Sequence, residues 1–155
     1  MKIKNVRPKD LIEIHNLEQK VFKENAFSKD LIKKLIQRST FFFKLERSGI
    51  KKFIIGFVII VEDREDRVNI VNFLINPKYQ NKGFGSWLLK YAIDKIKPLK
   101  KITKIVLNVK IDNHIAIKLY EKFNFRIVEK LDNYYQSKES AYLMVLDIDD
   151  MNNSI

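Results

Sequence analysis

Hydrophobic residues recur at two different spacings along the chain, and each spacing predicts one kind of secondary structure. Apolar residues three or four positions apart, as at Leu11, Ile14, Leu17 and Val21, indicate one face of an α-helix. Runs that alternate with polar residues, or that are apolar throughout and bounded by turn residues, indicate β-strands. On this basis we expect strands at residues 2–6, 40–46, 53–61, 68–75, 105–111, 126–131 and 141–148.

Helices are expected in four of the intervals between these strands. The first begins near Pro8, a residue favoured in a first helical turn, and the second follows Ser28, a good N-cap. The third follows a pair of glycines and ends before Pro98, and the fourth covers residues 115–123. The apolar faces expected for the second and third helices are, in order, Leu31, Ile32, Leu35 and Ile36, then Phe84, Trp87, Leu88 and Tyr91.

Two stretches are expected to lie outside these elements. The six consecutive charged residues at 62–67 are most simply the tip of a hairpin. Residues 149–155 are expected to be a flexible C-terminal tail, which leaves 1–148 as a single domain. The order is one strand, two helices, three strands, a helix, a strand, a helix and two strands. This order predicts an α/β protein in which helices cover a mixed sheet.

The composition excludes several classes of protein. At 155 residues the chain is long enough for one core, and its 46% hydrophobic content is too high for a disordered protein. The longest apolar run, at 53–61, is too short to span a bilayer, and the start does not resemble a secretory signal. We therefore expect a cytoplasmic location without membrane association. The absence of cysteine excludes thiol nucleophiles, thiolate metal sites and disulfides, and no metal site is predicted.

The net charge of +11 is a secondary clue to partners. A basic surface attracts polyanions such as nucleic acid, the ribosome or the phosphates of a cofactor. The lysines, however, are scattered among the predicted elements, so solvated lysine-rich faces explain the charge better than one binding patch. No specific nucleic acid is predicted, and the ribosome is kept as a candidate partner.

The segment at residues 80–86 lies between a predicted strand and a predicted helix and contains Gly83 and Gly85. Unpaired N–H groups of such a turn converge with the positive end of the helix dipole, which creates a site for an anion. Lys82 adds a mobile cation. A dinucleotide fingerprint would require a third glycine where Leu88 stands, and a P-loop would require its lysine after the glycines.

A second motif downstream indicates the family to which this turn is similar. Residues 80–85, Gln-Asn-Lys-Gly-Phe-Gly, resemble the Gln/Arg-x-x-Gly-x-Gly/Ala signature of the GCN5-related N-acetyltransferases (GNAT). That family next shows Asn-x-x-Ala-x-x-Leu-Tyr-x-x-x-x-Phe, and residues 113–125 of this chain match that pattern. The order and separation of the two motifs also fit.

The resemblance implies a fold, a cofactor and a set of residues that hold it. The expected GNAT fold has a mixed, mostly antiparallel central sheet, splayed fourth and fifth strands, and about four flanking helices. Acetyl-CoA, or coenzyme A, would place its pyrophosphate on the glycine turn and its pantetheine arm along the fourth strand. The implied cofactor-binding residues are Phe73, Leu74, Ile75, Gln80, Asn81, Lys82, Gly83, Phe84, Gly85, Ser86, Asn113 and Tyr120. Asn113 is also a candidate N-cap, and the two roles are compatible.

Acetyl transfer to an amine needs a base for the amine and an acid for the departing thiolate. Tyr120 is the predicted acid, because a phenol with a pKa of about 10 is protonated at neutral pH. Relatives carry the base on a strand at the position of Asn108, which is neutral and a poor proton acceptor. Another branch uses a glutamate between the first two helices, so Glu24 is the predicted base. Without cysteine to carry the acetyl group, direct transfer is favoured.

Two branches of the family resemble the chain nearly end to end. They are the ribosomal-protein-alanine acetyltransferases and the catalytic subunits of protein N-terminal acetyltransferases. The matching segments include residues 1–11, 132–135 and 139–144. The predicted function is therefore acetylation of the N-terminal α-amine of a protein or peptide. The residues implied for substrate binding are Asn25, Phe27, Val68, Asn108, Tyr134 and Tyr135.

Two other functions stay open on the sequence. An acetyltransferase for a small amine or a lysine side chain would keep the cofactor site but leave Tyr134 and Tyr135 without peptide contacts. A catalytically silent module that binds coenzyme A or RNA would account for Asn108 and for the net charge.

Overall fold

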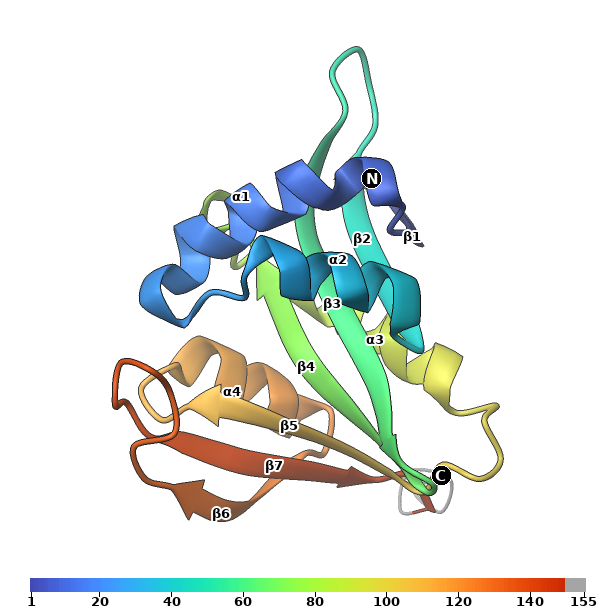
Figure 1. The fold of residues 1–155 in the computed structure, drawn as a ribbon. Helices are drawn as coiled ribbons and strands as arrows, with labels where there is room; N and C mark the ends of the chain where they lie inside the picture. The colour runs from blue at the N-terminus through green and yellow to red at the C-terminus, as the bar shows by residue number, and fades with distance from the viewer. Residues whose placement is uncertain (150–155) are drawn as a thin grey trace.

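Seven strands form one sheet in the computed structural model, which describes residues 1–149 (Figure 1). The strands lie in the order β1-β2-β3-β4-β5-β7-β6, and every neighbouring pair is antiparallel except β4 and β5. Their bounds are β1 Lys2–Asn5, β2 Phe41–Arg47, β3 Phe53–Arg64, β4 Arg67–Ile75, β5 Lys104–Lys110, β6 Arg126–Leu131 and β7 Ala141–Asp147. The predicted order of elements is confirmed. Of the predicted tail, residues 150–155 lie outside the described part of the chain.

Helices cover both faces of the sheet. The α-helices are α1 Leu11–Phe22, α2 Lys29–Arg38, α3 Phe84–Ile96 and α4 His114–Lys122, and the 3-10 segments are η1 Pro8–Asp10, η2 Lys23–Asn25 and η3 Pro77–Tyr79. Figure 1 shows α1 and α2 in front of β2, β3 and β4, with α3 behind the sheet. Ile14 and Ile32 belong to the core cluster under α1 and α2, and Leu88 and Ile117 to the cluster under α3 and α4. Within residues 1–149, no helix has the length and apolar character needed to cross a membrane.

Local sequence signals predict the start of α2 correctly, but they predict the buried face of α3 only in part. Ser28 caps α2 as predicted, because its Oγ accepts a hydrogen bond from the N–H of Leu31 at 3.1 Å. The predicted apolar face of α3 is partly wrong, since Trp87 is 41% exposed. The buried face of α3 is offset by about one residue from the predicted face. Its buried residues are Leu88, Leu89, Ala92, Ile93 and Ile96.

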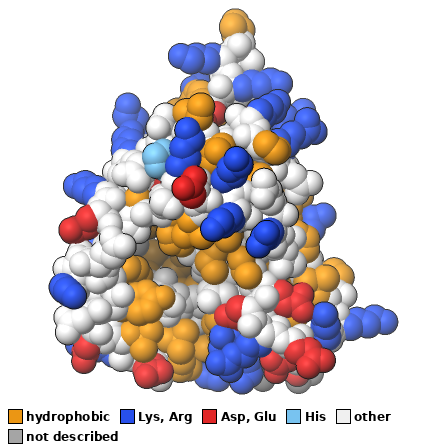
Figure 2. Space-filling view, viewed as in Figure 1, with side chains coloured by type: hydrophobic (Ala, Val, Ile, Leu, Met, Phe, Trp, Pro, Cys, Tyr) orange, Lys and Arg blue, Asp and Glu red, His pale blue; other side chains and the backbone are white. Residues whose placement is uncertain are grey.

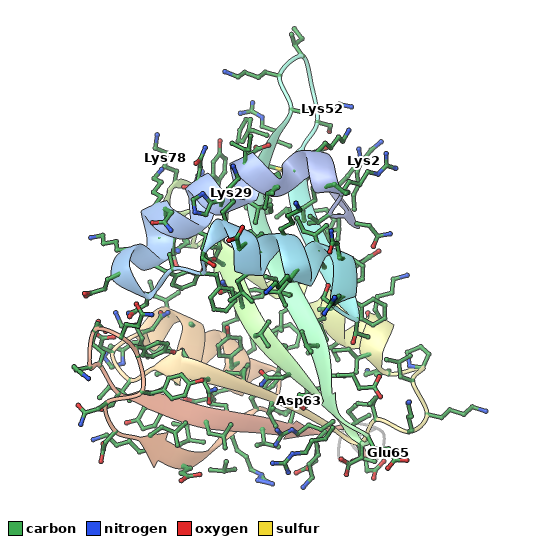
Figure 3. All side chains as sticks on the ribbon, viewed as in Figure 1. Lys2, Lys29, Lys52, Asp63, Glu65 and Lys78 are labelled. Carbon is green, nitrogen blue, oxygen red and sulfur yellow. The ribbon has the colours of Figure 1, made fainter. Side chains whose placement is uncertain are left out.

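The hairpin between β3 and β4 is tighter than the charged run predicts. β3 continues to Arg64 and β4 begins at Arg67, so the turn consists of residues 65–66 alone. Arg67 donates to Asp63, with 2.8 Å between Nη2 and Oδ2, which pairs opposite charges across the hairpin. The charged run therefore extends the strands. Figure 3 shows Asp63 and Glu65 at the end of the molecule opposite Lys52.

The parallel pair β4 and β5 separates after a short contact. Residues Arg67 to Ile70 pair with Lys104 to Leu107, and no pairing continues beyond them in the described chain. The remaining residues of β4, up to Ile75, still pair with β3. Their other edge therefore has backbone N–H and C=O groups that no strand satisfies, which confirms the predicted splay and exposes a strand edge to a ligand.

The splay begins at an irregularity in β4. Ile59 of β3 pairs with Asn72 and Ile60 pairs with Ile70, so Val71 has no partner on β3. Such a bulge bends a strand and redirects the side chains beyond it. The bulge therefore lies at the point where β4 leaves β5.

A buried ion network fixes the N-terminal segment to the sheet. Lys44 of β2 is 4% exposed, and its Nζ lies 3.0 Å from Asp10 Oδ1 and 2.9 Å from Glu46 Oε2. Lys4 reaches the second oxygen of Glu46 at 3.1 Å. The other oxygen of Asp10 accepts the N–H of Arg7 at 2.8 Å. The buried charges of this network, Asp10, Lys44 and Glu46, are thus all paired.

Candidate active site

A cleft of about 340 Å³ lies between the end of β4, the turn before α3 and one face of α4, and we call it the outer cleft. Its lining includes most of the residues that the sequence assigns to a cofactor, and two lysines of α4 that it does not. The lining residues are Val21, Phe22, Phe73, Leu74, Ile75, Gln80, Asn81, Gly83, Gly85, Ser86, Asn113, Ile115, Ala116, Lys118, Leu119 and Lys122.

The turn before α3 has the geometry of an anion site. The first helical hydrogen bond runs from Trp87 N–H to Gly83 C=O at 3.1 Å, so the amides ahead of Trp87 have no helical acceptor. Gly83 has a φ of 84°, a left-handed conformation that favours glycine. A Cβ on Gly85 would lie 3.2 Å from Leu119 Cδ2, so this glycine allows α3 to approach α4. Gln80 ties the turn to β4 by donating to the C=O of Ile75 at 3.0 Å.

A second cavity of about 110 Å³, which we call the inner pocket, opens between the splayed strands. Figure 2 shows the molecule hollowed below α1 and α2, where hydrophobic side chains gather. The inner pocket shares Phe22, Phe73, Asn113 and Ala116 with the outer cleft, so the two cavities meet. Its full lining is Glu18, Phe22, Asn25, Phe27, Ile70, Val71, Asn72, Phe73, Leu107, Asn108, Val109, Lys110, Asn113, Ala116, Tyr120 and Tyr135.

Tyr120 lies on α4 near this junction. Its side chain is 5% exposed, and its ring packs against Phe73 and Phe125 with centroids 6.0 and 5.7 Å away. Burial, and to a smaller extent the neighbouring Tyr135, raises the pKa of the phenol above its usual value. Tyr120 therefore keeps its proton across the physiological range and can act as a hydrogen donor toward the pocket.

Asn108 presents an unsatisfied oxygen in the inner pocket. Its Nδ2 donates to the hydroxyl of Tyr134 at 2.9 Å, but its buried Oδ1 has no hydrogen-bond partner among residues 1–149. A buried acceptor without a donor is costly, and such groups are uncommon in folded proteins. The oxygen is therefore available to accept an N–H of a ligand. Asn113 also caps α4 as predicted, since its Oδ1 accepts the N–H of Ala116 at 3.2 Å.

Two loops far apart in the sequence close one side of the inner pocket. Asn25 of η2 donates to Ser137 Oγ at 3.1 Å and accepts the N–H of Ser137, also at 3.1 Å. The same β6–β7 loop carries Tyr134 and Tyr135, whose rings pack edge to face with centroids 4.9 Å apart. These contacts bring Asn25 and Tyr135, two of the residues implied for substrate binding, to the same pocket.

Glu18 is a buried carboxylate in the wall of the inner pocket and is 1% exposed. Its Oε1 accepts the N–H of Phe27 at 2.9 Å, and its Oε2 accepts Nδ2 of Asn72 at 2.6 Å. Asn72 in turn accepts the N–H of Phe73 at 2.9 Å. Burial raises the pKa of Glu18 to about 7, although both hydrogen bonds act in the opposite direction.

The raised pKa of Glu18 predicts a pH-dependent stability. Between the ordinary pKa of 4.5 and about 7, native Glu18 binds a proton that the unfolded chain has lost. The free energy of unfolding should therefore fall as pH rises through this window, by up to about 3 kcal/mol. Glu18→Gln should remove this dependence, and urea unfolding of both proteins at pH 5 and pH 8 measures it. A wild type and variant with parallel profiles would contradict the assignment.

Several predicted site residues lie elsewhere. Glu24 is exposed on η2 and lines neither cavity, and Val68 is fully buried where β4 and β5 are still paired. Lys82 and Phe84 do not line the outer cleft, and Lys82 Nζ instead lies 5.7 Å from the ring centroid of Tyr79. Tyr134 is 48% exposed and reaches the inner pocket only through Asn108.

The sequence reasoning missed residues on two helices. Ile115, Lys118, Leu119 and Lys122 recur at helical spacing, so the face of α4 that lines the outer cleft could have been read from the chain. Glu18 follows Leu17 on the buried side of α1, and a carboxylate inside an apolar stripe was the available signal.

A model of the acetyltransferase (GNAT) family matches residues 9–125. The chain belongs to the GNAT family. Members of this family are acetyltransferases, and residues of both sequence motifs line the outer cleft. The crystal structure of Arabidopsis thaliana NAA60 in complex with acetyl-CoA has a similar fold, with a TM-score of 0.85 over 96% of this chain and 98% of that chain. At 18% identity this likeness concerns the fold of this GNAT protein alone.

Relatives with a named activity align with this GNAT protein over segments of different length. An N-alpha-acetyltransferase of Saccharolobus solfataricus is 37% identical over 76 residues, which is 49% of this chain and 46% of that relative. The chain thus spans about half the length of that relative. The ribosomal protein bS18-alanine N-acetyltransferase of Escherichia coli (strain K12) is 27% identical over 94% of this chain and 97% of its own. A crystal structure of the Escherichia coli enzyme has a TM-score of 0.80, with 95% and 93% of the two chains covered.

Proposed function

We propose that this GNAT protein transfers the acetyl group of acetyl-CoA directly to the N-terminal α-amine of a protein or peptide. The observation that carries the proposal is the meeting of the two cavities at Phe73, Asn113 and Ala116. One cavity has a backbone anion site and the other has an unsatisfied acceptor, with a protonated phenol near their junction. A donor and an acceptor bound in them would be held side by side, as direct transfer requires.

The outer cleft fits the acetyl donor, which supplies an activated thioester when it is bound. The free amides of Gly83, Gly85 and Ser86 would hold the pyrophosphate, with positive charge from Lys118 and Lys122 on α4. The unpaired edge of β4 at residues 73–75 would hydrogen-bond the amides of the pantetheine arm in the manner of an added strand. Asn113 lines both cavities and would contact the same arm.

The inner pocket fits the first residue of a peptide. Asn108 Oδ1 would accept an N–H of the α-amine, and Asn25 and Phe27 would bound the first side chain. Tyr134 and Tyr135 would hydrogen-bond the peptide backbone from the β6–β7 loop. Tyr120 would protonate the departing thiolate, and an N–H of the β4 edge would stabilise the oxyanion.

The named activities of two relatives support an α-amine as the acceptor. Both the archaeal and the bacterial relative are N-terminal acetyltransferases by name, and the bacterial one acts on an alanine of ribosomal protein bS18. An α-amine has an ordinary pKa of about 7.7–8.0, against about 10.4 for lysine. An α-amine is therefore the easier acceptor for a site in which Asn108 replaces a charged base.

Peptide acetylation tests the proposal. We expect short peptides with a free N-terminus to be acetylated, and the same peptides with a blocked N-terminus not to be. The release of coenzyme A measures the reaction. Activity that survives blocking when a lysine is present would instead indicate a lysine acetyltransferase. Binding of coenzyme A without any turnover would indicate a silent module. Isothermal titration with acetyl-CoA is the control for the outer cleft, and absence of binding would contradict the cofactor assignment.

A further inference from the structure

We infer that Glu18 is the group that takes the proton from the incoming amine in the inner pocket. This inference rests on the proposed acetyl transfer and assigns the base to α1, not to the exposed Glu24. Asn108 lines the inner pocket but is neutral and a poor proton acceptor, so the proton needs another acceptor. Glu18 lies in the same pocket as Asn108 and Tyr120.

The other titratable side chains that line the inner pocket cannot serve as the base. Within the described chain they are Lys110, Tyr120 and Tyr135. Lys110 is a cation already paired with Glu139 at 2.8 Å. Burial raises the pKa of Tyr135 to about 12 and raises that of Tyr120 as well, so both phenols hold their protons. Glu18 is therefore the sole carboxylate among the pocket-lining residues.

The surroundings of Glu18 fix its position but leave it able to accept a proton. The N–H of Phe27 and the amide of Asn72 each occupy one oxygen, and a carboxylate has about four lone-pair sites in total. The residues of α2 and β3 in the adjoining core cluster are apolar, among them Ile32, Phe57 and Ile59. Within residues 1–149 no cation forms an ion pair with Glu18, so nothing holds it permanently ionised.

The hydrogen bonds of Glu18 also link the base to the strand edge beside the donor. Asn72 donates to Glu18 and accepts from the N–H of Phe73, which lines both cavities. The position of the carboxylate is thus coupled to the backbone of β4 and to the loop that carries Phe27. Such support is what a group needs to be held at a productive distance from the reacting atoms.

Glu18 and Tyr120 together account for every proton that moves during acetyl transfer. The amine nitrogen forms a bond to the acetyl carbon while its proton passes to the Glu18 carboxylate, directly or through one water. The carbon–sulfur bond then breaks, and the sulfur takes the proton of Tyr120. Glu18 and Tyr120 return to their starting states when a proton is exchanged through solvent. With a pKa of about 7, Glu18 is largely ionised at the pH where an α-amine becomes neutral.

Three variants test the inference in steady-state kinetics of the full chain with saturating acetyl-CoA and peptide between pH 5.5 and 9.5. We expect kcat of the wild type to rise with pH to a plateau above about pH 7, in line with the pKa of Glu18. Glu18→Gln should lower kcat at pH 7 about 100-fold and abolish this inflection. Glu18→Asp should restore part of the rate, because it keeps the carboxylate. Glu65→Gln, in the β3–β4 turn and outside both cavities, is the control and should behave as the wild type.

The outcomes separate this inference from the proposed function. One outcome is that the wild type acetylates α-amines while Glu18→Gln keeps both the rate and the inflection. That result overturns the assignment of Glu18 as the base and leaves the proposed function intact. A raised KM with unchanged kcat would likewise show a purely structural role. A wild type without activity on any free α-amine overturns both. If Glu18→Gln does not fold, Glu18→Asp decides, since an unmoved inflection contradicts the inference and a displaced one supports it.

Discussion

Tyr120→Phe is expected to lower kcat by about 100-fold or more without weakening acetyl-CoA binding. The substitution removes a hydroxyl of the inner pocket, and it keeps the ring that packs against Phe73 and Phe125. The leaving thiolate would then depart without a proton into an apolar surrounding, where its charge is poorly solvated. Rapid-quench measurement of a single turnover would show whether the chemical step is slowed.

A matched control is available for this prediction. Tyr142 of β7 packs against the same core cluster as Tyr120 but lines neither cavity. Tyr142→Phe should therefore leave kcat unchanged. If Tyr120→Phe stayed within threefold of the wild type, the phenol would not be the acid, and water would have to protonate the thiolate.

Lys44→Met should lower the free energy of unfolding by about 3–5 kcal/mol. The lysine compensates two carboxylates that are 6% and 8% exposed, Asp10 and Glu46. Its hydrogen bond holds the pKa of Glu46 below the ordinary value, and without it a buried negative charge would lose its main partner. Urea unfolding at neutral pH measures the change.

Lys4→Met is the matched control for the ion network. Lys4 reaches the same Glu46, but its side chain is 43% exposed, so the loss should stay below about 1 kcal/mol. Equal losses for the two lysines would mean that burial does not strengthen the network. A stable Lys44→Met variant would show that Asp10 and Glu46 take up protons or water instead.

The sequence predicted the elements well because its apolar spacing is regular in most of them. The two motifs also located the outer cleft, since a glycine turn after a buried strand and an asparagine before a helix are local features. The same local reasoning failed for Trp87, because helical spacing does not say which of two adjacent faces meets the sheet. At residues 62–67 it located the hairpin but not the ends of its strands, where the ion pair between Asp63 and Arg67 joins charged residues across the two strands.

The acceptor side was harder to predict because its contacts join distant parts of the chain. Asn25 and Ser137 are 112 positions apart, and nothing near either residue marks the other as its partner. The role proposed for Glu18 depends on Asn72 and Phe27, which the fold brings to it from β4 and from the loop before α2. Glu24 matches a family pattern along the chain, but the 3-10 segment turns it toward solvent.

The short contact between β4 and β5 has a consequence for how this protein can change. Four residue pairs join the β1–β4 half of the sheet to the half formed by β5, β7 and β6. Each extra rung of that ladder would strengthen the scaffold and at the same time seal the space in which donor and acceptor meet. Gains in rigidity at this seam are therefore incompatible with turnover, and more stable descendants of this chain must find their added stability elsewhere.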